Sequence, residues 1–326
     1  MDIDLSVLRL LEREKEIPFD ELVQIIEAAI LAAYYKHIGE HPKGCRANLD
    51  RKTGHVSVFA AVLDGEGEPT ETENEVTPEG FGRVAAYAAK QVIAQRMREI
   101  ADEGLMGEFK GKEGDIVAGQ IQQGSRPYMV YVNLGSIEAI MPPEEQVPGE
   151  DYSHGRRIRV YVTSVQKGLR GPMITVSRTH PNLVRKLFAL EVPEVASGQV
   201  EITSIAREAG HRTKISVRSN EPGINAKGAC IGELGQRVRA VSSELNEEKI
   251  DVVDHSENLA EFVAHALSPA KVSSSFVIDA GLKAVRVLVP DFQLSLAIGK
   301  EGQNARLAAK LTGAKIDIQP DSTMDE

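Results

Sequence analysis

The sequence predicts a multidomain α+β protein with a mixed α/β N-terminal domain, a small β-barrel and two copies of one α/β unit. Three observations carry this prediction. The first third alternates helical and strand-like hydrophobic periodicity, the middle contains five short strand signals, and the last part repeats a glycine-containing motif. A length of 326 residues predicts two or three domains.

The N-terminal domain is expected over residues 1–105. Asp4 can cap a short helix, and Pro18 opens a longer one whose apolar residues recur at i, i+3 and i+4 spacing. Two strands are expected at Ala47–Leu49 and Val56–Phe59.

The end of this domain is expected to contain a loop and a helix. The acidic segment Asp64–Glu75 has almost no apolar residues and is predicted to form a mobile loop. A second long helix is expected from about Pro78 to Ala101, and Gly104 and Gly107 mark the domain boundary.

The next domain is expected over residues 106–179, where the hydrophobic period changes to that of strands. Glycine and proline residues separate five short strand signals, a number typical of the five-stranded OB-fold barrel. The predicted strands are Ile116–Gln122, Tyr128–Leu134, Glu138–Ile140, Arg157–Val165 and Met173–Arg178.

The last part contains an internal repeat. Ile231–Gln236 lies 67 residues before Ile298–Gln303, and Arg239 and Arg306 follow at the same offset. Each copy places a Gly-x-x-Gly turn between two helical segments. Strand signals flank both copies, at Lys214–Arg218, Ile250–Val253, Phe276–Ile278, Ala284–Val289 and Ile316–Ile318.

A Gly-x-x-Gly turn in this context is typical of a KH domain. Glycines let the backbone approach a phosphate, and the following helix directs its N-terminal amides at the anion, so that a KH domain clamps about four nucleotides of a single strand. Two KH domains are therefore predicted, at residues 180–255 and 256–326; the alternative is that the glycines only turn the chain. The candidate RNA-binding residues are Gly232, Glu233, Leu234, Gly235, Gln236, Arg237 and Arg239 in the first, and Gly299, Lys300, Glu301, Gly302, Gln303, Asn304 and Arg306 in the second.

The Gly-x-x-Gly motif alone does not identify a KH turn. Gly111–Gly114 has the same sequence as Gly299–Gly302, but it precedes a strand and lies in no repeat. We expect this copy to be an ordinary loop.

The formal net charge of −10 conceals an uneven distribution. Residues 152–240 hold 15 basic and 6 acidic side chains, whereas the rest of the chain is acidic. Such a basic band attracts phosphate independently of sequence; a solvated surface is the alternative. Arg178, Arg185 and Lys186 belong to this band and join the candidate RNA contacts.

Motifs of other functional classes are not found. The sequence has no His-x-x-x-His pair, Walker loop or Gly-x-Ser-x-Gly elbow, so no catalytic residue, metal or cofactor is expected. No run of 18 apolar residues predicts a membrane span, and two isolated cysteines, Cys45 and Cys230, are compatible with a cytoplasmic location.

Several strings resemble the NusA family of bacterial transcription termination and antitermination factors, in order over the whole chain. They are the helix Phe81–Arg96, the junction Ser177–Pro181, and the turn segments Gly228–Gly232 and Ala297–Ala308. The ending at Glu326 is similar to short family forms without acidic C-terminal repeats.

The resemblance implies an RNA polymerase-binding N-terminal domain, an S1-type OB-fold barrel and two type II KH domains. Such a protein binds RNA polymerase and nascent single-stranded RNA, including ribosomal-RNA leader antitermination sites, and modulates pausing, intrinsic termination and antitermination. Its implied partners are NusB, NusE and NusG, and it is expected to be a non-enzymatic monomer. The alternatives are an RNA-binding accessory module of an RNA-degradation enzyme and a pure protein scaffold.

Two departures from the family pattern affect the expected RNA contacts. The first turn carries Glu233, where the family often has a basic residue, and its carboxylate repels phosphate. The barrel lacks a clear Phe/Phe/His stacking platform, and Tyr128 and Tyr131 are the nearest candidates. Glycine turns and backbone amides are thus expected to contribute more than stacked rings.

Overall fold

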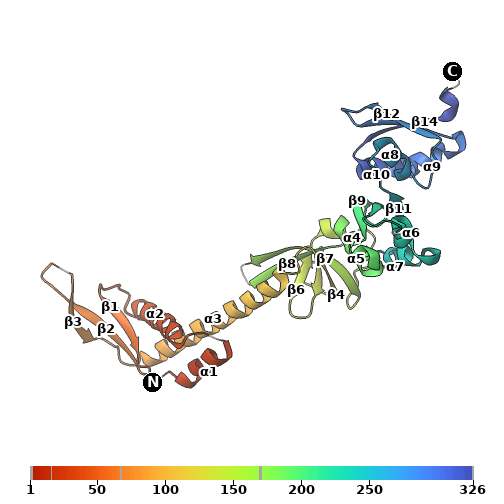
Figure 1. Ribbon diagram of the computed structural model, residues 1–326. Coiled ribbons are helices and arrows are strands. Elements are labelled where there is room, and N and C mark those ends of the chain that lie inside the picture. The colour runs from red at the N-terminus through yellow and green to blue at the C-terminus, as the bar shows by residue number, and fades with distance from the viewer. Residues whose placement is uncertain (1–2, 16, 67, 169–170, 325–326) are drawn as a thin grey trace. The chain divides into compact units, whose positions relative to one another are not determined.

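The computed structural model describes residues 3–15, 17–66, 68–168 and 171–324. The chain divides into two compact units, Met1–Gly107 and Glu108–Glu326 (Figure 1).

The N-terminal unit is a three-stranded antiparallel sheet packed with helices. Its elements are α1 (Leu5–Lys15), α2 (Phe19–Ile38), β1 (Cys45–Leu49), β2 (Val56–Leu63), β3 (Pro69–Glu75) and most of α3 (Gly82–Lys110). The strand order is β1-β2-β3, and the buried core includes Leu8, Ile26, Ile30, Val58 and Ala85. The apolar residues of the helices and those of the strands therefore pack together in one core.

Two predictions for this unit are wrong. The segment Asp64–Glu75 is not simply a loop, because β3 pairs with β2 and Arg46 binds Glu73 at 2.6 Å between Nη2 and Oε2; within it, Gly67 lies outside the described residues. An edge strand needs only backbone pairing on one side, so its side chains can remain polar. The helix α3 also continues past Ala101 to Lys110, through Gly104 and Gly107, since a glycine costs a helix only about 1 kcal/mol relative to alanine. The division between the two compact units nevertheless falls after Gly107.

The five predicted barrel strands are confirmed. They are β4 (Ile116–Gln122), β5 (Val130–Asn133), β6 (Glu138–Met141), β7 (Arg157–Gly168) and β8 (Gly171–Ser177). They close in the order β4-β5-β6-β8-β7. Gly111–Gly114 forms a turn between α3 and β4 and not between two helices, as predicted.

The predicted repeat is also confirmed, because the two copies have the same topology. The first contains α4 (Pro181–Glu191), α5 (Pro193–Ala196), β9 (Val200–Glu208), β10 (Arg212–Ser219), α6 (Ala226–Ile231), α7 (Gln236–Glu244) and β11 (Lys249–Asp254). The second contains α8 (Leu259–Ala266), β12 (Ser274–Asp279), β13 (Ala284–Val289), α9 (Leu294–Ile298), α10 (Gln303–Thr312) and β14 (Lys315–Pro320). In each sheet the central strand, β10 or β13, is antiparallel to the first and parallel to the last.

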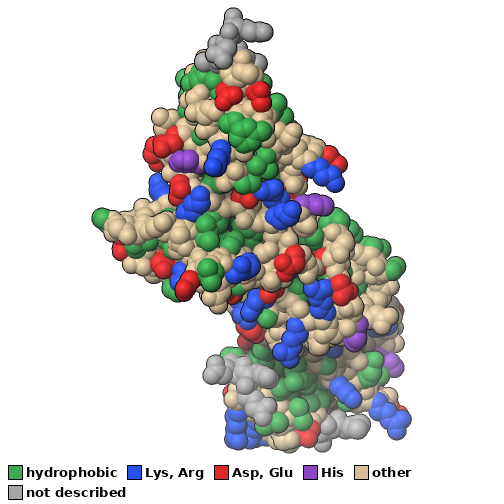
Figure 2. Space-filling model, turned by 90° about the vertical axis from the view of Figure 1, so that its right-hand side faces the viewer, with side chains coloured by type: hydrophobic (Ala, Val, Ile, Leu, Met, Phe, Trp, Pro, Cys, Tyr) green, Lys and Arg blue, Asp and Glu red, His purple; other side chains and the backbone are tan. Residues whose placement is uncertain are grey.

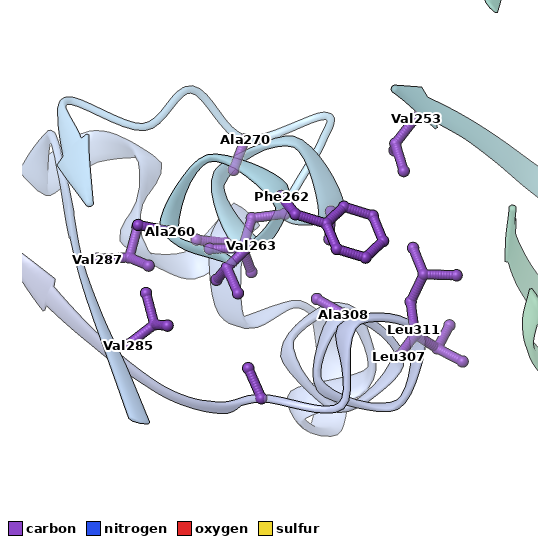
Figure 3. Close-up of a cluster of buried hydrophobic side chains, with 14 of the residues drawn as sticks. Val253, Ala260, Phe262, Val263, Ala270, Val285, Val287, Leu307, Ala308 and Leu311 are labelled. Carbon is purple, nitrogen blue, oxygen red and sulfur yellow. The ribbon is translucent and has the colours of Figure 1, made fainter. Parts of the chain in front are cut away.

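The two copies share a hydrophobic core. Ala206 of β9 and Val253 of β11 belong to the same buried cluster as Phe262 of α8 and Leu311 of α10. Figure 3 shows Val253 directed from its strand toward Phe262 and Leu311. This shared apolar contact places the two Gly-x-x-Gly turns on one folded body.

Candidate nucleic-acid interface

The two Gly-x-x-Gly turns have nearly the same backbone conformation. The first glycines, Gly232 and Gly299, have φ/ψ of 75°/173° and 77°/168°. The third residues, Leu234 and Glu301, have 50°/24° and 55°/27°. Positive φ at a leucine and a glutamate is uncommon, so its occurrence at equivalent positions marks a defined turn and not a chance loop.

The first glycine of each turn is required by close packing. A Cβ added to Gly299 would lie 2.8 Å from the backbone nitrogen of Asn304, and one added to Gly232 would lie 2.7 Å from Cγ of Arg237. At Gly302 nothing lies within 4 Å of such an atom, so the outer side of the second turn is open.

Each turn leads directly into a helix without a side-chain cap. The N-cap residues of α7 and α10 are Gly235 and Gly302, and no side chain there accepts a hydrogen bond from the first amides. The first amides of a helix have no partner within it, and the macrodipole makes this end positive. Both turns therefore present an anion-binding helix terminus beside an exposed glycine-containing backbone.

The side chains of the two turns differ in charge. The first exposes Glu233 and Leu234, the latter 86% exposed, whereas the second exposes Lys300 and Glu301. Among the described residues, Lys300 and the exposed Arg239 have no ion-pair partner. The second turn is consequently the more favourable of the two for a phosphate.

Arg178 is not available to RNA, contrary to the prediction. Its side chain is buried and lies 2.5 Å from Glu150 of the barrel. It also donates to the backbone oxygens of Arg159, at 2.9 Å, and Glu244, at 2.8 Å. Arg178 therefore joins the barrel to the end of α7, because three acceptors surround the guanidinium and exclude solvent.

Asn304 is also buried, which corrects its prediction as an RNA contact. Its Nδ2 donates to the backbone oxygens of Leu267 and Ala297, both at 2.9 Å. These bonds hold the end of α9 against α10 and thereby fix the second turn. The residue supports the turn and does not face a ligand.

Three predicted cations are partly occupied by protein partners. Arg237 pairs with Glu194 at 2.9 Å, and Lys186 pairs with Asp115 at 3.3 Å. Arg185 donates to the backbone oxygen of Ile202. These contacts reduce the charge that each cation can offer to RNA.

Gln303 and Arg306 contact a carboxylate that sequence reasoning missed. Glu208, at the end of β9, accepts from Arg306 Nε at 2.6 Å and from Gln303 Nε2 at 2.9 Å. The hydrogen bond from Arg306 is the main reason that the pKa of Glu208 falls to about 2. No local signal identifies Glu208, since it lies in the other copy of the repeat.

The basic band does not form a continuous basic surface over the described residues. Several of its cations pair with acids outside the band, as in Arg159 with Glu244 at 2.7 Å and Arg212 with Asp251 at 2.7 Å. On the face seen in Figure 2, basic and acidic side chains are intermixed. The charge of a sequence segment thus overstates the charge available on the folded surface.

Exposed apolar side chains near the second turn were not among the contacts predicted from the sequence. Phe292, Leu296 and Ile298 are 81%, 44% and 40% exposed, and they precede Gly299. In the barrel, Tyr128 is 58% exposed and Tyr131 is half-buried. Apolar surface for nucleobases is therefore available beside the second turn as well as at Tyr128.

Metal sites and membrane spans are not found among the described residues. No group of three or more His, Cys, Asp or Glu side chains there could hold a metal ion. No helix there combines the length and apolar character needed to cross a membrane.

The fold and the paired turns define a class: an RNA-binding protein with tandem KH domains behind an OB-type barrel. Family models describe residues 5–64 as a NusA N-terminal domain, 178–255 as a NusA-like first KH domain and 259–326 as a NusA-like second KH domain. The chain belongs to the NusA family.

Two relatives named transcription termination/antitermination protein NusA match over nearly their whole length. The protein of Mycobacterium tuberculosis H37Rv is 56% identical over 329 residues, which cover 99% of this chain and 94% of the relative. The protein of Bacillus subtilis is 46% identical over 343 residues, which cover 99% and 92%.

Proposed function

We propose that this protein is a transcription termination and antitermination factor that binds RNA polymerase through residues 1–105 and nascent single-stranded RNA through residues 106–326. The observation that carries the RNA part is the matching backbone of the two Gly-x-x-Gly turns, each at the uncapped N-terminus of a helix. Family membership supports the polymerase part.

An S1-type domain at 106–179 precedes KH domains at 180–255 and 256–326. The proposed RNA contacts are Gly232, Glu233, Leu234, Gly235, Gln236, Arg239, Gly299, Lys300, Glu301 and Gly302. Arg185, Lys186 and Arg237 contribute less, because each also has a protein partner. Gln303 and Arg306 are left out because both bind Glu208. The protein acts by binding, as a cytoplasmic monomer with NusB, NusE and NusG as further partners, and labelled RNA incubated with it and Mg²⁺ should stay intact.

The test replaces Lys300 and Glu301 by aspartate in the full chain. Aspartate tolerates the positive φ of 55° at position 301 better than most residues, so the backbone should persist. Removing Lys300 and adding a carboxylate should weaken single-stranded RNA binding by about 10- to 100-fold, the size of one lost charge-assisted hydrogen bond. The measurement is the dissociation constant at fixed salt.

The chain supplies a matched control. Lys112→Asp with Glu113→Asp makes the same change in the same four letters, in a turn that lies between a helix and a strand. Lys112 loses an exposed ion pair with Glu108, which stabilises by less than about 1 kcal/mol. Equal RNA affinity of the test variant and the wild type would contradict the proposed site.

A transcription assay tests the regulatory part. Pausing and termination by the cognate RNA polymerase should change with the wild-type protein and with the control variant, and change less with Lys300→Asp, Glu301→Asp. A protein that alters neither pausing nor termination would contradict the proposed function.

A further inference from the structure

The first helical turn of α10 is occupied by a carboxylate from the other KH copy. One carboxylate oxygen of Glu208 accepts a hydrogen bond from Arg306 Nε, at 2.6 Å, and the other accepts one from Gln303 Nε2, at 2.9 Å. Arg306 also donates from Nη1 to the backbone oxygen of Glu301, inside the second Gly-x-x-Gly turn, at 3.1 Å. The guanidinium thus lies between the turn and Glu208.

This arrangement resembles the binding of an anion by the turn. Two oxygens of one anionic group accept from a guanidinium and an amide, which is how non-bridging phosphate oxygens are bound. We propose that Glu208 is an internal anion that occupies this subsite, withholds Arg306 from RNA phosphates and so limits the RNA affinity of the second KH turn. This inference rests on the proposed function, because it assumes that the second turn binds RNA.

The carboxylate has an advantage over an RNA phosphate. It is held in place by the apolar core that the two KH copies share, and an intramolecular group competes at an effective concentration in the millimolar range. Its low pKa, about 2, keeps it ionised near neutral pH. RNA at a concentration below this effective concentration would contact Lys300 and the backbone of the turn, but not Arg306.

The site is still within reach of solvent. The side chain of Arg306 is 47% exposed, while that of Glu208 is 20% exposed. Removal of the Glu208 charge would therefore leave an accessible guanidinium beside Lys300. Lys310 of α10 is close enough to contribute to the low pKa of Glu208, so it too would lose a nearby negative charge.

The experiment measures single-stranded RNA binding by the full chain as a function of salt. Glu208→Gln keeps the size and a hydrogen-bonding oxygen while it removes the charge. It should tighten binding about three- to tenfold and steepen the slope of log K against log salt by about 0.7, the value for one more phosphate contact on a single strand. Weaker or unchanged binding, or an unchanged slope, would overturn the inference.

A second variant tests the inference independently of how Glu208→Gln folds. Because Arg306 is withheld in the wild type, Arg306→Gln alone should change affinity less than twofold and leave the slope as it was. In the Glu208→Gln background the same change should abolish the gain. A slope that falls by about 0.7 on Arg306→Gln alone would show that Arg306 already contacts phosphate, and would refute the inference.

Glu201→Gln is the matched charge control. Glu201 lies on the same strand, β9, and pairs with Arg218 at 2.8 Å, about 23 Å along the strand from Glu208. The Glu201→Gln variant should leave the slope of log K against log salt unchanged. A slope steepened as much as by Glu208→Gln would show that the effect comes from net charge. If Lys300→Asp with Glu301→Asp weakens RNA binding while Glu208→Gln has no effect, only this inference fails, and the proposed function stands.

Discussion

Replacement of Arg178 by methionine tests whether this buried guanidinium joins the barrel to the first KH copy. Methionine fills much of the volume of arginine, so the change removes mainly charge and hydrogen bonds. The variant leaves Glu150 buried, with its side chain 2% exposed and without its cation. The hydroxyl of Tyr152, at 2.7 Å, still donates to the Glu150 carboxylate.

The size of the effect follows from this burial. Breaking a buried ion pair by removing one partner destabilises a protein by about 3–5 kcal/mol, because a charge remains without compensation. The backbone oxygens of Arg159 and Glu244 lose a donor as well. We therefore expect a loss near the upper end of this range.

Native-state hydrogen exchange is the suitable assay, because the chain has two compact units and a single two-state transition cannot be assumed. Amides of β7 and α7 should lose about 3–5 kcal/mol of protection in the variant. The double variant Glu150→Gln, Arg178→Met should recover part of this loss, since no buried charge then remains.

The control is Arg159→Gln, which breaks a pair with Glu244 whose side chains are 46% and 23% exposed. It should reduce protection by less than about 1 kcal/mol. A loss of this small size in Arg178→Met, or strictly additive effects of the two buried substitutions, would contradict the role of Arg178 in joining the barrel to the first KH copy.

Two further predictions concern the turn glycines and His180. Gly299→Ala should reduce the hydrogen-exchange protection of α10 more than Gly302→Ala; both positions have positive φ, but only the Cβ at Gly299 would lie 2.8 Å from the Asn304 nitrogen, and equal protection in the two variants would contradict this. Burial lowers the pKa of His180, whose Nδ1 accepts from the Asn182 amide at 3.1 Å, so the unfolded chain takes up its proton first as pH falls below about 6.5. The free energy of opening at the amides of α4, measured by hydrogen exchange, should therefore fall less between pH 7.5 and 5.5 in His180→Asn than in the wild type, and an identical fall in the two proteins would contradict the pKa shift.

Features encoded over short distances were predictable from the sequence. The five barrel strands, the main helices and the repeat were recognised because periodicity, glycine positions and a 67-residue offset are local or self-similar signals. The strand β9 was missed because serine and threonine interrupt its apolar pattern, and β3 because its residues are polar on an edge.

Local sequence patterns were sufficient to predict the architecture, the family and the position of the two turns. Which predicted cations are free to contact RNA depends on the packing of distant segments. Arg178 is neutralised by a residue 28 positions away, and Arg306 by one 98 positions away, in the other KH copy. Pairing and burial depend on which distant segments the packed core brings together, so a count of charges along the chain could not separate a guanidinium that joins two domains from one that is open to phosphate.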